Sequence, residues 1–193
     1  MEGKVTPKIR WLKLSLFLVA SVTLALVVFN PPYAPVVSAQ APANESTLIA
    51  LTNAERLKSG LQSLNFDPQL YQAAVTKAED IFQKQYFDHY SPNGTTPWQF
   101  ILSSGYDYEY AGENLAIGFN DYQAVTEAWM ESPTHKANIL NPRYHDIAIA
   151  AVKGEFDGRE TTVIVQMFGT KRPYILSNIS NAAETVLGSQ INP

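Results

Sequence analysis

The chain has 193 residues, of which 46% are hydrophobic and 17% are charged. This length suits one well-packed domain, and this composition excludes both a wholly disordered chain and a multi-pass membrane protein. The net charge of -4 at pH 7 argues against nucleic acid as a partner, because basic patches dominate the affinity of proteins for nucleic acid.

The first 39 residues have the pattern of an export signal. Basic side chains precede an uncharged, apolar stretch from Leu14 to Phe29, and the small residues Val37-Ser38-Ala39 follow at the spacing that a signal peptidase reads. Residues 1–39 are therefore predicted to be either a cleaved signal peptide or an N-terminal membrane anchor, with residues 11–30 in the bilayer if the segment is retained. Both alternatives place the remainder outside the cytoplasm, either secreted or anchored at the membrane.

The chain contains no cysteine. An exported protein without disulfides must be stabilised by its apolar core, which favours a bacterial envelope origin. Residues 40–45 end a proline-rich stretch and are predicted to be a linker, so the globular domain is expected to begin near Ser46.

Helical periodicity dominates the first half of this domain. Apolar residues recur every three or four positions from Leu48 to Leu61, which predicts a first helix. Asp67 followed by Pro68 is typical of a helix start, and apolar residues then keep to one helical face as far as Gln85.

A loop is predicted next, over residues 86–95, because this segment contains Pro92 and Asn93-Gly94. Thr96-Pro97 then begins a short helix that extends to Leu102.

Residues 106–119 are aromatic and apolar, which predicts an extended segment around Glu113. Asp121 begins a fourth helix. Ser132-Pro133 begins a fifth helix in the same manner and places His135 in its first turn.

The last part of the domain has strand periodicity. Residues 147–151 and 163–167 alternate between apolar and other side chains, and residues 154–160 are predicted to form a charged hairpin loop between them. Helices come first and strands last, which predicts an α+β fold with helices packed on an antiparallel sheet. Residues 171–193 show weak patterning and are predicted to be a C-terminal tail.

Three residues are the candidates for chemistry. His89 and His135 occupy turn and cap positions, and a histidine in the first turn of a helix stays neutral and available as a metal ligand or base. Glu113 lies between Gly112 and Asn114 among apolar residues, so it is expected to be partly buried and to need a partner. Spacing alone does not bring the three together, and the alternative is two loop histidines and a structural glutamate.

Five motifs together have a family resemblance. They are LTNAERLKSGLQSLNFDPQL at 51–70, YFDHYSPNG at 86–94, AGENLA at 111–116, AWMESPTHKANILNPRYHDIAIA at 128–150 and VQMFG at 165–169. Motif by motif and in the expected order, the chain resembles the bacterial branch of the CAP superfamily, whose members share the SCP domain with cysteine-rich secretory proteins, antigen 5 and plant pathogenesis-related proteins. The resemblance covers residues 46–170.

This resemblance implies a CAP-type α-β-α sandwich, with a central antiparallel sheet flanked by helices, over residues 46–170. It also implies an open cleft lined by two histidines and one or two acidic residues, which His89, Glu113 and His135 match. Two histidines and a carboxylate with open coordination positions suit a weakly held divalent cation, most simply zinc.

The second acidic residue of the family has no direct match. Its place, three positions after Trp129, holds Ser132. Glu131, one position earlier, is therefore the candidate for the fourth cleft residue, and Asn114 is expected to adjoin the cleft.

Three possibilities remain open at this point, one of which is a purely structural envelope protein with a vestigial site. The first is a secreted or surface-exposed binding module, whose cleft takes a divalent cation and an envelope or extracellular ligand. The alternative is a metal-dependent hydrolase of cell-envelope material, with Glu113 as the base that activates water. No serine is patterned as a nucleophile, because Ser91 and Ser132 have turn or cap roles.

Overall fold

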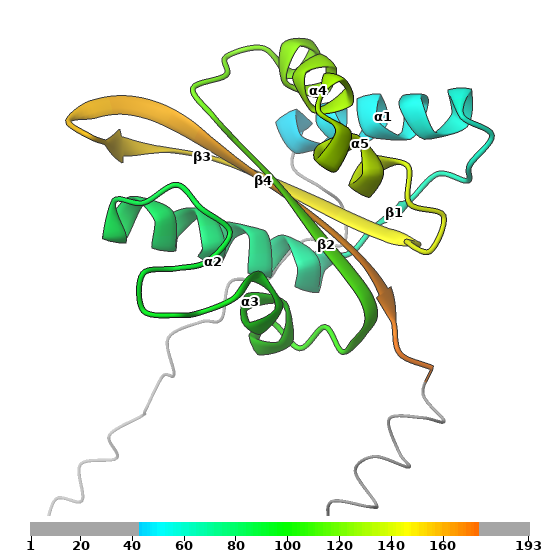
Figure 1. The fold of residues 1–193 in the computed structure, drawn as a ribbon, viewed down its shortest axis with the longest axis horizontal. Coiled ribbons are helices and arrows are strands. Elements are labelled where there is room, and N and C mark those ends of the chain that lie inside the picture. Colours follow the sequence, from blue (N-terminus) through cyan, green and yellow to red (C-terminus); the bar gives the residue numbers. More distant parts are fainter. Residues whose placement is uncertain (1–42, 174–193) are drawn as a thin grey trace, which may run out of the picture. The chain divides into compact units, whose positions relative to one another are not determined.

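The computed structural model describes residues 43–173, which form a four-stranded sheet with helices on both faces (Figure 1). In chain order the elements are α1 (Ala43–Lys58), β1 (Asn65–Phe66), α2 (Pro68–Lys84), α3 (Pro97–Ser103), β2 (Tyr108–Ile117), α4 (Tyr122–Glu131), α5 (Pro133–Ile139), β3 (Asp146–Phe156) and β4 (Arg159–Lys171). The predicted α+β sandwich is confirmed.

The strands lie in the order β1-β3-β4-β2. The three long strands are antiparallel, as predicted, whereas the two-residue β1 runs parallel to β3 and makes the sheet mixed. Strand β2, which carries Glu113, is therefore an edge strand, and β4 lies between β2 and β3.

Each face of the sheet has its own buried cluster. Helices α2 and α3 cover one face with side chains such as Leu70 and Ile101, while α1, α4 and α5 cover the other with side chains such as Leu48 and Trp129 (Figure 1). Successive residues of β4 alternate between the two clusters, because side chains of a strand point to opposite faces; Val165 belongs to the first and Ile164 to the second.

Local capping explains why the helices begin where the sequence predicts. The Asp67 carboxylate accepts hydrogen bonds from the first turn of α2, and Thr96 forms a capping box with Gln99 at the start of α3. Asp121 caps α4 in the same way, and α5 begins at Pro133, although the Ser132 side chain makes no capping hydrogen bond there.

The predicted hairpin loop over residues 154–160 is wrong. Strand β3 continues to Phe156 and β4 begins at Arg159, so Asp157-Gly158 alone forms the turn. Both turn residues have positive φ, 51° and 72°, which is the conformation that a two-residue hairpin favours and that Asp-Gly adopts readily. The charged residues that indicated a loop are exposed side chains of a two-stranded ribbon.

The ends of the described region differ slightly from the predicted segments. Helix α1 already includes Ala43, three residues before Ser46, and β4 includes Lys171, whose ammonium pairs with the Asp67 carboxylate at 2.7 Å. The predicted leader or anchor, and residues 174–193 of the predicted tail, lie outside the described residues. Between residues 43 and 173, no helix is long and apolar enough to cross a membrane.

Candidate functional site

The structure brings His89 and Glu113 into direct contact. His89 follows α2 in the loop before α3, Glu113 lies in β2, and the His89 Nδ1 atom is 2.6 Å from Glu113 Oε1. The His89 side chain is 48% exposed, whereas the Glu113 side chain is 1% exposed. An accessible imidazole therefore covers a buried carboxylate.

The two residues before Glu113 in β2 pack closely against Tyr144. At position 112 a Cβ atom would overlap the hydroxyl of Tyr144, so a larger residue than glycine would require Tyr144 to move. Tyr144 instead donates a hydrogen bond to the Ala111 carbonyl, at 3.0 Å.

Burial and hydrogen bonding set the electrostatics of this pair. Burial raises the pKa of Glu113, and the hydrogen bond to Glu113 raises the pKa of His89. Glu113 Oε2 is also buried but has no hydrogen-bond partner among residues 43–173. A buried acceptor without a donor costs free energy. A ligand donor or a cation that contacts this oxygen atom would remove that cost and so bind more tightly.

A cavity of about 250 Å³ opens beside this pair. Tyr90 and Trp98 contribute aromatic walls, and His89, Glu113 and Asn138 contribute polar groups. A small apolar pocket with a few convergent polar groups is typical of a ligand site.

His135 lies in the first turn of α5, as predicted. Burial lowers the pKa of its ring, and the charge of a protonated His89 lowers that pKa further, so the two rings are close enough for their charges to interact. The His135 carbonyl accepts a hydrogen bond from Asn114 Nδ2 at 3.2 Å. Asn114 thus ties α5 to β2, but among the described residues neither Asn114 nor His135 lines the cavity beside Glu113.

Asn138, which the sequence analysis did not include in the cleft, completes this link. Its amide donates to the Glu113 carbonyl at 3.0 Å and to Asn114 Oδ1 at 2.8 Å. Asn114 in turn donates to Gln166 Oε1 at 2.9 Å. The signal for Asn138 was its place three residues after His135, on the same face of a helix.

Three alternate carbonyls of the edge strand β2 accept hydrogen bonds from side chains rather than from a further strand. They are the carbonyls of Ala111, Glu113 and Leu115. The donor to Leu115 is the indole of Trp129 at 3.1 Å. Helices α4 and α5 and the segment after them therefore hold the strand that carries Glu113.

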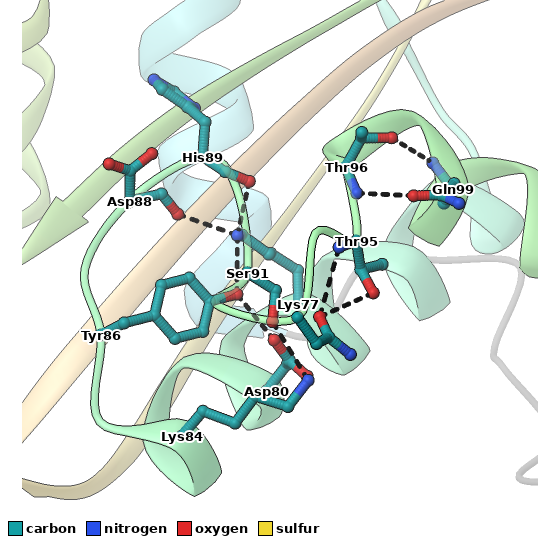
Figure 2. Close-up of polar contacts among 11 residues, drawn as sticks. Lys77, Asp80, Lys84, Tyr86, Asp88, His89, Ser91, Thr95, Thr96 and Gln99 are labelled. Carbon is teal, nitrogen blue, oxygen red and sulfur yellow. Dashed lines mark hydrogen bonds and ion pairs between the residues drawn. The ribbon is translucent and has the colours of Figure 1, made fainter.

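Sequence reasoning also missed Lys77, which contacts the backbone beneath His89. Its ammonium donates to the carbonyls of Asp88, at 2.9 Å, and His89, at 2.8 Å (Figure 2). The available signal was a lysine among the apolar residues of one face of α2, where a solvent-facing position is not expected. Burial lowers the pKa of this lysine.

Comparison with known proteins identifies the family. The sequence profile of the cysteine-rich secretory protein family, CAP, matches residues 49–168. The chain belongs to the CAP family. The resemblance inferred from the five motifs is thus confirmed.

The curated relatives of this CAP domain are bacterial. The uncharacterized protein YkwD of Bacillus subtilis is 42% identical over 111 residues, which cover 58% of this chain and 43% of YkwD. The uncharacterized membrane protein YlbC of Bacillus subtilis is 30% identical over 106 residues, which cover 55% of this chain and 31% of YlbC. The chain therefore spans less than half the length of both relatives.

Solved structures of two bacterial proteins have the same fold. An extracellular protein containing an SCP domain from Bacillus anthracis is 27% identical, with a TM-score of 0.58, over 66% of this chain and 40% of that chain. An outer surface protein from Borrelia burgdorferi is 25% identical, with a TM-score of 0.58, over 66% of this chain and 92% of that chain.

The structure does not bring Glu131 to the other cleft residues of this CAP domain. Glu131 lines a separate depression with Glu55 and Glu127, whereas the cavity beside Glu113 contains none of these three. Trp129 points into the core, and a residue two positions later on a helix projects from nearly the opposite side.

The predicted ligands do not form a ready-made metal centre. In the described part of the chain, no three His, Cys, Asp or Glu side chains are grouped so as to hold a metal ion. His89 Nδ1 and Glu113 Oε1 already bind each other, so the residues as placed fit a hydrogen-bonded pair rather than a three-ligand site.

Proposed function

We propose that this CAP-domain protein is a binding module that acts outside the cytoplasm and takes an envelope or extracellular ligand in the cavity beside His89 and Glu113. The observation that carries the proposal is that Glu113, whose buried Oε2 has no partner among the described residues, lines that cavity. A hydroxyl or ammonium group of a ligand would satisfy this oxygen, and apolar parts of the ligand would pack on Trp98 and Tyr90.

The proposed location has two supports. The sequence begins with the pattern of an export signal, and two proteins with the same fold are described as extracellular or as outer surface proteins. Peptidoglycan fragments are a suitable first probe, because they carry hydroxyl and ammonium donors for the unpartnered Glu113 Oε2.

A divalent cation, zinc first, stays a prediction for His89, Glu113 and His135. Binding would require ligation to replace the hydrogen bond between His89 and Glu113. When bound, such an ion would supply a Lewis acid next to the cavity.

The test is calorimetric titration of the purified protein with soluble peptidoglycan fragments, with and without EDTA, and separately with zinc. Glu113→Gln is expected to weaken fragment binding by roughly 10-fold or more, because a hydrogen bond to a charged group contributes about 1.5–3 kcal/mol. Glu109→Gln is the matched control, since Glu109 is an exposed glutamate of the same strand and should leave binding unchanged.

The outcomes separate the functions. Equal affinities for wild type and Glu113→Gln would overturn the proposed site. Breakdown of the fragments that stops on addition of EDTA, and that Glu113→Gln abolishes, would support the hydrolase instead. Zinc heats that are the same in wild type and in a His89→Ala/His135→Ala variant would remove the cation from these residues.

A further inference from the structure

We propose that Lys77 is a positioning residue, whose buried ammonium fixes the loop backbone so that His89 meets Glu113. Lys77 lies in the middle of α2 and is 0% exposed. It does not border the cavity and makes no hydrogen bond with the Glu113 carboxylate, so beyond the attraction between their charges its effect on the site acts through the loop.

The contacts of this ammonium are complete. It donates to the carbonyls of Asp88 and His89 and, at 2.9 Å, to the hydroxyl of Tyr86 (Figure 2). A lysine ammonium has three N–H groups, and the three acceptors use all of them. The aromatic faces of Tyr86 and Phe100 complete the surroundings, with centroids 4.7 and 5.6 Å from Nζ.

All three acceptors are uncharged, which makes Lys77 unusual among buried cations. A buried charge is costly, and an apolar side chain would cover this face of α2 at lower cost. What an apolar side chain would not supply is a donor for the two loop carbonyls. We therefore infer that the role of Lys77 is to fix the conformation of the loop.

A second cation holds the same loop two residues after His89. Lys84 pairs with the Asp80 carboxylate at 2.5 Å and donates to the Ser91 hydroxyl at 3.0 Å. Tyr86 connects the two anchors, because its hydroxyl accepts from Lys77 and donates to Asp80 at 2.7 Å (Figure 2). Of the two lysines, Lys77 is the one that binds the His89 backbone itself.

His89 depends on this anchor because about half of its side chain is in solvent. A side chain that packs so little is placed mainly by its own backbone and by its one hydrogen bond. If the Asp88 and His89 carbonyls lose their donor, they will turn toward water, and the Nδ1 to Oε1 contact should be lost.

The test is a long-range 1H–15N NMR spectrum of the histidine rings in the metal-free protein, for wild type and Lys77→Met. In wild type we expect a downfield, slowly exchanging Nδ1 proton on His89, which reports the hydrogen bond to Glu113. In Lys77→Met we expect this signal to be lost, while the ring signals of His145, whose Nδ1 contacts the Thr170 hydroxyl, stay unchanged.

Two further variants keep the result interpretable. Ile164→Val lowers stability from the core cluster on the other face of the sheet and should leave the His89 signal intact. Lys77→Gln keeps a neutral donor at the same position, so it provides a folded variant if Lys77→Met does not fold. In Lys77→Gln the His89 Nδ1 signal should be weakened, but less than in Lys77→Met.

An unchanged His89 Nδ1 signal in folded Lys77→Met, or in Lys77→Gln if the former does not fold, would overturn the proposal. Loss of the signal in Ile164→Val as well would also overturn it, because general destabilisation would then suffice. This inference deepens the proposed binding site and rests on it for its functional meaning. The NMR signal needs no ligand, so failure of ligand binding and failure of the positioning role can be told apart.

Discussion

At the scale of single residues, the site is defined by a carboxylate that is buried but only half satisfied. Glu113 Oε1 binds His89, and Oε2 has no partner among the described residues. Burying this carboxylate costs free energy, and an apolar side chain at the same position would avoid that cost.

The pair should give stability a characteristic pH dependence. The folded-state pKa of His89 is raised by its hydrogen bond to Glu113. The stability that this adds is fully present below the ordinary histidine value of about 6.5, and it is lost as pH rises through the folded pKa. The difference in free energy of unfolding between wild type and His89→Gln should therefore shrink as the pH rises above the ordinary histidine value.

Urea denaturation of the metal-free protein measures this difference. His145→Gln, which removes an exposed imidazole, is the matched control for the loss of a histidine ring. A difference in free energy of unfolding between wild type and His89→Gln that stays constant or increases with pH would contradict the prediction.

The close packing beside Glu113 gives a second prediction. Gly112→Ala should lower the free energy of unfolding by about 1–3 kcal/mol, because the new methyl group would overlap the Tyr144 hydroxyl. Thermal or urea unfolding measures the loss. In the Tyr144→Phe background the same substitution should cost less, and an equal cost in both backgrounds would place the strain elsewhere.

At the scale of elements, the edge strand and α5 hold each other through amide side chains. Asn138→Ala would leave the Asn114 oxygen and the Glu113 carbonyl without their donor. The expected loss is about 1–3 kcal/mol in the free energy of unfolding. Lys136→Ala, an exposed position on the same helix, should change it by less than about 0.5 kcal/mol. Similar losses in both variants would show that the amide contacts are not the cause, since alanine has the highest helix propensity.

How far the sequence predicts these elements depends on how local the signal is. Asp67, Thr96 and Asp121 cap the helices by bonding their own next residues, so each start could be read from a few letters. The ribbon around Asp157-Gly158 was misjudged because its exposed charges resemble those of a loop.

The site was less accessible to such reasoning. His89 and Glu113 are 24 residues apart, and only the family motifs indicated that they meet. Lys77 was overlooked because charged side chains on helices normally face solvent, although the helical spacing of α2 places position 77 on its apolar face. Its partners are backbone carbonyls of a loop, whose directions no residue pattern encodes.

At the scale of the whole molecule, the two buried clusters share strands β3 and β4, and neither can lose its packing without disturbing the other. Variants that keep only Trp98 or only Trp129 place one fluorescent probe near each cluster. In each variant, unfolding followed by fluorescence should coincide with unfolding followed by circular dichroism. A fluorescence midpoint that differs from the dichroism midpoint would show that one face unfolds separately.

The side-chain donors along β2 have a consequence for association. The outer edge of a sheet is normally a template on which a strand of another molecule can pair. Here the carbonyls of Ala111, Glu113 and Leu115 are already bound by Tyr144, Asn138 and Trp129. A strand of another molecule would need these carbonyls as acceptors. The strand that carries the buried carboxylate can therefore border an open cavity and still be protected from edge-to-edge aggregation.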